Sequence, residues 1–144
     1  KNKKSTIKNL SKILKNKDLS DVDFASNIQN TMRNYLEVRF DFPFTKTVSS
    51  EIKGKYLFAV ESASEQKVCA IECIQKIFCQ TDIIRYGQKS FGINKTSFLE
   101  KEKETLVEQL IQSIETLEVV EVVEVFEIEN DNKENNIKEG ENNA

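Results

Sequence analysis

The sequence predicts an α/β fold, an α+β two-layer sandwich in which a mainly antiparallel sheet of about four strands is packed by two helices. Apolar and polar side chains alternate over 35–42, a Val-rich run spans 118–129, and residues 97–117 carry an apolar helical stripe. N-terminal helices and a disordered acidic C-terminal tail complete this prediction. Within the 144 residues, we expect a basic amphipathic arm over 1–17, a single α/β domain over 18–129 and the tail over 130–144.

The first predicted element is a basic amphipathic helix over 5–16, which Ser5 or Thr6 can cap. Its apolar side chains share one helical face, with lysines around it; they are Ile7, Leu10, Ile13 and Leu14. Such a helix fits a nucleic acid, an anionic membrane surface or a partner protein. A helix packed on its own domain explains the pattern equally well.

A second helix is expected from Ser20 to about Asn30, because Ser20 and Asp23 have the spacing of a capping box. Phe24, Ile28 and Met32 then share one face. The acidic side chains near its start are explained by the helix dipole, so we predict no metal site there.

Tyr35–Phe42 is the clearest predicted strand, and Pro43 ends it. The stretch 44–79 leaves two alternatives open, because its apolar residues fit a helical face as well as short strands. Next come a short strand over 81–86 and a loop over 87–94.

The C-terminal part of the domain is predicted as a helix followed by a strand. Ser97 and Glu100 have capping-box spacing and open a helix that runs to Leu117. The β-branched run 118–129 favours a strand after it.

Several classes of chemistry are excluded by composition. The chain has no His, which excludes Ser-His-Asp and Cys-His catalysis and His-based zinc sites. Its four Gly do not form a phosphate-binding loop, and no carboxylates form an isolated apolar pair. The odd count of three cysteines indicates small buried hydrophobes in a reducing compartment rather than a disulfide framework. We therefore expect no catalytic residue, no metal, no cofactor and no membrane span.

Charge is distributed unevenly along the chain, and this distribution gives the candidate binding residues. Residues 1–17 carry seven lysines and no acid, whereas 118–144 carry nine acids and two lysines. Basic side chains of the arm and of the predicted strand ends and loops would together contact an RNA backbone without reading sequence. The candidate RNA-binding residues are Lys1, Lys3, Lys4, Lys8, Arg33, Arg39, Lys46, Arg85, Lys89 and Lys95.

The order of predicted elements resembles the small α/β protein subunits of ribonuclease P and ribonuclease MRP, the Pop and Rpp family. The resemblance covers about residues 33–129 and depends on four features. The first two are a strand that ends in Phe-Pro, here Tyr35-Leu-Glu-Val-Arg-Phe-Asp-Phe-Pro43, and a helix that starts at Thr45-Lys46. The other two are a strand with Asp82-Ile83-Ile84-Arg85 in place of Gly-Ile-Ile-Arg, and a final helix followed by a Val-rich strand. Departures are Asp82 for Gly, a longer loop over 87–96 and no Ser-Gly-Thr after the last strand. The resemblance implies a helix over 46–63 and a strand over 67–77.

The same resemblance implies a non-catalytic subunit of a ribonucleoprotein that processes tRNA and rRNA precursors. Such a subunit scaffolds RNA, pairs with a related α/β subunit through strands or helices, and works in the nucleus or nucleolus, or elsewhere in a reducing cell interior, without being secreted. One alternative is a divergent α/β ribosomal protein, which Lys55-Tyr-Leu-Phe-Ala-Val60 and Phe91-Gly-Ile-Asn-Lys-Thr96 resemble. The other is an RNA-free protein-interaction module.

Overall fold

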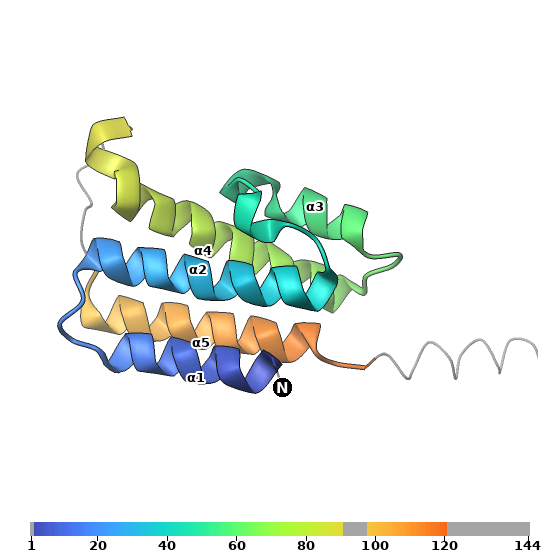
Figure 1. The fold of residues 1–144 in the computed structure, drawn as a ribbon, viewed down its shortest axis with the longest axis horizontal. Helices are drawn as coiled ribbons and strands as arrows, with labels where there is room; N and C mark the ends of the chain where they lie inside the picture. Colours follow the sequence, from blue (N-terminus) through green and yellow to red (C-terminus); the bar gives the residue numbers. More distant parts are fainter. Residues whose placement is uncertain (1, 91–97, 121–144) are drawn as a thin grey trace, which may run out of the picture.

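The chain folds as a helical bundle, and the predicted α/β sandwich is wrong. The computed structural model describes residues 2–90 and 98–120, with side chains over 2–86 and 98–120, and these residues contain no strand (Figure 1). They form five α-helices and two 3₁₀ turns: α1 (Asn2–Lys15), α2 (Asp21–Phe40), η1 (Phe44–Lys46), η2 (Ser49–Glu51), α3 (Ile52–Ala59), α4 (Glu65–Ser90) and α5 (Glu100–Leu117).

The four long helices pack as an antiparallel bundle with α3 on its outside. Each of α1 and α4 contacts both α2 and α5, so α1 lies diagonally across from α4. Successive long helices run in opposite directions, and α3 with the two 3₁₀ turns packs against α4 and the end of α2 (Figure 1). The bundle therefore brings the start of α1 beside the end of α5.

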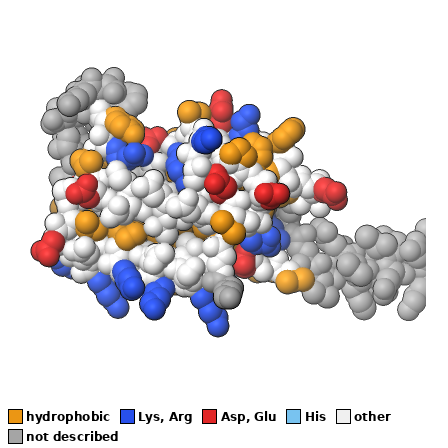
Figure 2. All heavy atoms as spheres, in the orientation of Figure 1, with side chains coloured by type: hydrophobic (Ala, Val, Ile, Leu, Met, Phe, Trp, Pro, Cys, Tyr) orange, Lys and Arg blue, Asp and Glu red, His pale blue; other side chains and the backbone are white. Residues whose placement is uncertain are grey.

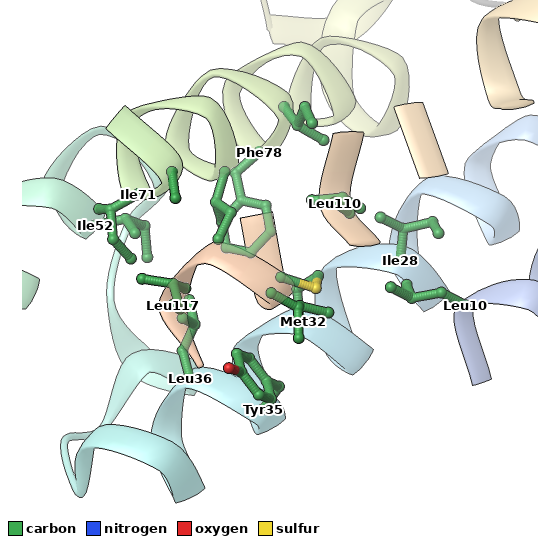
Figure 3. Packing of buried hydrophobic residues seen from close by; sticks show 14 of the residues in the cluster. Leu10, Ile28, Met32, Tyr35, Leu36, Ile52, Ile71, Phe78, Leu110 and Leu117 are labelled. Atoms are coloured by element: carbon green, nitrogen blue, oxygen red, sulfur yellow. The ribbon is translucent and has the colours of Figure 1, made fainter. Parts of the chain in front are cut away.

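The core contains apolar side chains from all four long helices and from α3 (Figure 3). Because helical residues three and four apart lie on one face, each helix contributes a stripe to the shared core. The fully buried side chains shown include Leu10, Ile28, Met32, Tyr35, Leu36, Ile52, Ile71, Phe78, Leu110 and Leu117.

The helix predicted to end near Asn30 continues to Phe40 as α2, so the predicted strand 35–42 lies mostly in α2. The start of this helix was predicted correctly. The Ser20 side chain caps α2 by accepting a hydrogen bond from the Asp23 backbone N–H at 3.1 Å. Leu36 is fully buried whereas Val38 is 69% exposed, so the alternation does not describe one face. Asp41, with φ of 51°, ends the helix in the left-handed conformation that Asp tolerates.

The strands predicted at 67–77 and 81–86 both lie in α4, and so does the first part of the loop predicted at 87–94. Thr81, a β-branched residue, is fully buried, and its hydroxyl donates to the Ile77 backbone oxygen at 2.9 Å. This bond to the preceding turn satisfies the hydroxyl inside the helix. The helix implied over 46–63 is much shorter in the structure, where α3 spans only Ile52–Ala59.

The end of α5 matches the prediction, but its start differs slightly. The helix begins at Glu100 and ends at Leu117, and Glu102 accepts a hydrogen bond from the Leu99 backbone N–H at 3.2 Å. Ser97 lies outside the described residues. Residues 118–120 form no strand, while the rest of the strand predicted at 118–129 and the tail over 130–144 also lie outside the described residues.

The cysteines are less buried than predicted. Cys69 is exposed, and Cys73 and Cys79 are half-buried, with Cys73 packed against the core.

Among the described residues, none of the helices has the length and apolar content needed to cross a membrane.

Candidate nucleic-acid interface

An exposed basic surface lies along α1. We define the lysine stripe as Lys4, Lys8, Lys12 and Lys15, four exposed side chains within about 80° around the helix axis and over about 16 Å of its length. Figure 2 shows basic side chains in a row along the edge of the molecule that α1 forms. Within the described part of the chain, none of the four makes an ion pair. The stripe is therefore available to an anionic partner.

The opposite face of α1 is buried in the bundle. Leu10 is fully buried and Thr6 is 5% exposed, while Ile7, Ile13 and Leu14 pack against the core. This arrangement matches the alternative in which the helix packs on its own domain. The apolar face cannot enter a membrane while the bundle is folded, so only the charged face of α1 is open to a partner.

Two lysines, one near the start of α1 and one two residues after its end, form ion pairs with α5. The Lys3 ammonium lies 2.7 Å from the Glu115 carboxylate, and the Lys17 ammonium lies 2.6 Å from that of Glu100. These ion pairs fix α1 alongside α5 at both ends. Lys3 is thus only partly available to a ligand.

Arg33 lies in a groove between α2, α4 and the 3₁₀ turns, but its guanidinium is used internally. It donates to the backbone oxygens of Phe44, at 2.8 Å, and Thr47, and to the Ser49 hydroxyl at 3.1 Å. Its Nε donates to the Gln29 side-chain oxygen at 3.2 Å. Burial lowers the pKa of Arg33 from its usual value, while Asp82 opposes this effect and Arg85 adds to it.

Gln29 connects the residues that line this groove through hydrogen bonds. It is neutral, and no pattern in the sequence marks it as a candidate site residue. It is fully buried, and its amide nitrogen donates to the backbone oxygen of Phe78 at 3.1 Å and to the side chains of Thr81 at 2.8 Å and Asp82 at 2.6 Å. Its oxygen accepts from both Arg33 and Arg85. A buried amide with this many partners fixes α2 to α4.

Arg85 and Lys46 line the same groove, whose volume is about 340 Å³. Arg85 donates to Gln29 at 3.3 Å, lies 3.8 Å from the Asp82 carboxylate and stacks over the Tyr86 ring. The structure therefore brings together three of the predicted residues, but two of them are held by internal partners.

Arg39 lies apart from this groove, at the end of α2, where it pairs with Glu118. Glu118 also accepts a hydrogen bond from the buried Tyr35 hydroxyl at 2.8 Å. Burial, together with this bond, raises the pKa of Tyr35. Burial alone would raise the pKa of the Glu118 carboxyl, but hydrogen bonds from Arg39 and Tyr35 outweigh it and hold that pKa below its usual value.

The Glu118 cluster predicts a pH-dependent contribution to stability. Because the pKa of Glu118 is lower in the folded protein than in the unfolded chain, its contribution is present above about pH 4.3 and is lost as pH falls through the folded value. Glu118→Gln should lower the free energy of unfolding by about 1–2 kcal/mol at pH 7. Urea unfolding should show a much smaller difference near pH 3. An equal loss for Glu104→Gln, an exposed residue of α5, would contradict this role.

The ten predicted residues thus divide into separate groups. Lys4 and Lys8 belong to the lysine stripe, Lys3 and Arg39 pair with α5 or the residue after it, and Arg33, Lys46 and Arg85 lie at the groove. Lys1 and Lys95 lie outside the described residues, as does the side chain of Lys89. Lys12 and Lys15 were not predicted, although their helical spacing from Lys8 is the signal that identifies them.

Comparisons with protein-family models, with curated proteins and with solved structures find no match to this chain. Among the described residues, no group of three or more His, Cys, Asp or Glu side chains could hold a metal ion.

Proposed function

We propose that the protein is a non-catalytic RNA-binding protein that contacts the RNA backbone through the lysine stripe of α1. The observation that carries this proposal is the exposure of four lysines, without ion pairs to any described residue, on one face of a helix whose other face is buried. Packing α1 in the bundle fixes the helix backbone before binding, so the ordering entropy lost when a partner binds comes from the lysine side chains alone.

The chemistry of the stripe favours a row of phosphates as the ligand. Successive lysines at four-residue spacing are about 6 Å apart along the helix axis, which gives a linear array of positive charges. Ammonium groups are compact point charges, and the stripe contains neither the planar fork of Arg nor an aromatic ring. We therefore propose binding to the backbone without sequence readout.

The assignment to ribonuclease P or MRP stays a prediction about which RNA is bound. Helices replace the strands 35–42 and 81–86, which contain two of the sequence features behind that resemblance, and the strand 67–77 that it implies. Pairing with a related subunit through a sheet edge has no strand available among the described residues. We propose the coarser function because it depends on the lysine stripe alone.

The test is a comparison of two double variants with the same net charge. Lys4→Gln/Lys8→Gln removes half of the stripe, whereas Lys55→Gln/Lys76→Gln neutralises two exposed lysines on α3 and α4. For a single-stranded 20-nucleotide RNA, four phosphate contacts predict a slope of about −2.8 for log K against log salt. The stripe variant should reduce the magnitude of this slope by about 1.4 and weaken binding, while the control should change neither appreciably.

Fluorescence anisotropy with labelled RNA between 50 and 200 mM NaCl measures both quantities. Gln and Lys have similar helix propensities, so α1 should keep its fold, and circular dichroism can verify this. Equal weakening by the two variants would mean that only net charge matters and would overturn the proposed interface. Failure of the wild-type protein to bind RNA at 50 mM NaCl would overturn the proposed function.

A further inference from the structure

The C-terminal segment leaves the bundle beside the start of the lysine stripe. Glu115, one turn before the end of α5, forms its ion pair with Lys3, the residue next to Lys4. Glu118 follows at the end of α5 and contacts Tyr35 and Arg39 of α2. In Figure 1, the end of α5 and the start of α1 lie side by side. Whatever the path of the chain after residue 120, it starts from this end of α1.

The charges of the stripe and of this segment are complementary. Residues 121–129 contain four Glu and no basic residue, which matches the four lysines of the stripe. The larger segment 121–144 contains eight acidic residues and two lysines. Opposite charges this close together on one chain have a high effective concentration for each other.

The segment is also long enough to cover the stripe. Nine extended residues span up to about 30 Å, whereas the stripe is about 16 Å long. Running back from the end of α5 along α1, the segment would pass Lys4 first and Lys15 last. Its four glutamates, at 121, 124, 127 and 129, are spread along this length, and Val119 and Val120, which precede it, are exposed.

We propose that residues 121–129 bind the lysine stripe of their own chain and compete there with RNA. This proposal rests on the proposed function only for the competition, because the contact within the chain can be tested without RNA. The segment acts as an internal mimic of the phosphate backbone, so RNA binds only molecules in which the stripe is free. If four in five molecules have the stripe covered, the apparent affinity for RNA is reduced about fivefold.

The contact itself is tested by zero-length cross-linking of the full-length protein with a water-soluble carbodiimide, followed by mass spectrometry. The ion pairs Lys3–Glu115 and Lys17–Glu100, at 2.7 Å and 2.6 Å, serve as internal positive controls. We expect additional links from the lysine stripe to Glu121, Glu124 and Glu127 that are unchanged by dilution and suppressed by 0.5 M NaCl. Links that appear only between two molecules, or the absence of such links while both controls are present, would overturn the proposal.

The competition is tested with two triple variants that raise the net charge equally. Glu121→Gln/Glu124→Gln/Glu127→Gln removes charge from the segment, and Glu61→Gln/Glu104→Gln/Glu108→Gln removes it from exposed positions of the body. The segment variant should bind the 20-nucleotide RNA about fivefold more tightly than wild type, and the body variant less than twofold. An equal gain in both variants would overturn the competition. Loss of all RNA binding with the cross-links retained would overturn the proposed function and leave the contact intact.

Discussion

Replacing Leu10 by Ala should lower the free energy of unfolding of the whole chain by about 2–5 kcal/mol. Leu10 is fully buried and belongs to the same core as Ile28, Met32 and Leu110 (Figure 3). Removing its terminal isopropyl group takes apolar area out of the core and leaves a cavity between α1, α2 and α5. Because a small domain is stable by only about 5–15 kcal/mol, this loss should be visible as a large shift of the urea midpoint.

The result distinguishes a helix of the bundle from an arm. Were residues 1–17 an independent arm, Leu10→Ala would leave the unfolding of the rest unchanged. Leu57→Ala is the matched control, since the same truncation occurs at a side chain of α3 that is 45% exposed. A loss below about 1 kcal/mol for Leu10→Ala, or an equal loss for both variants, would contradict the packing of α1. Urea unfolding followed by circular dichroism measures both.

The sequence predicted helix starts and stops better than it predicted fold class. The cap at Ser20 and the end of α5 at Leu117 were identified because capping side chains and apolar stripes are local features. The strand 35–42 was wrong because Leu36, Phe40 and the residues between them fit both periods over a stretch this short. Only the longer helical repeat that begins at Phe24 resolves it, since Phe24, Ile28, Met32 and Leu36 are all buried on one side of α2.

The error at 81–86 has a different physical origin. Two adjacent isoleucines and a threonine favour a strand by intrinsic propensity, but that propensity amounts to only about 1 kcal/mol and packing overrides it. Ile84 is buried, and Thr81 bonds to its own helix and accepts from Gln29 of α2. The Gln29–Thr81 bond and the core packing of Ile84 join α4 to residues far along the chain, 52 positions away for Gln29. They therefore could not be read from a local window.

The candidate site shows the same limit. Lys4 and Lys8 could be predicted because the face of a helix is encoded in the spacing of its own residues. The internal partners of Arg33, Arg39 and Arg85 could not be predicted, because an arginine bound to its own protein and one free for a ligand look alike in sequence. Their internal partners lie far along the chain, as Glu118 does from Arg39.

Replacing Arg33 by Met should cost about 2–4 kcal/mol of stability, because two backbone oxygens of the 3₁₀ turns and the Gln29 oxygen lose a charged donor. Arg33→Lys should not rescue it, since a single ammonium lacks the planar fork that reaches several acceptors. Arg85→Met is the matched control in the same groove and should cost less than about 1 kcal/mol, because its bond to Gln29 at 3.3 Å and its contact with Asp82 are weaker. If Arg33→Met and Arg85→Met lowered the free energy of unfolding equally in urea, Arg33 would not be the residue that holds the 3₁₀ turns in place. The expected inequality means that this arginine holds α2 to the turns, and in the proposed function the contacts to RNA come from α1.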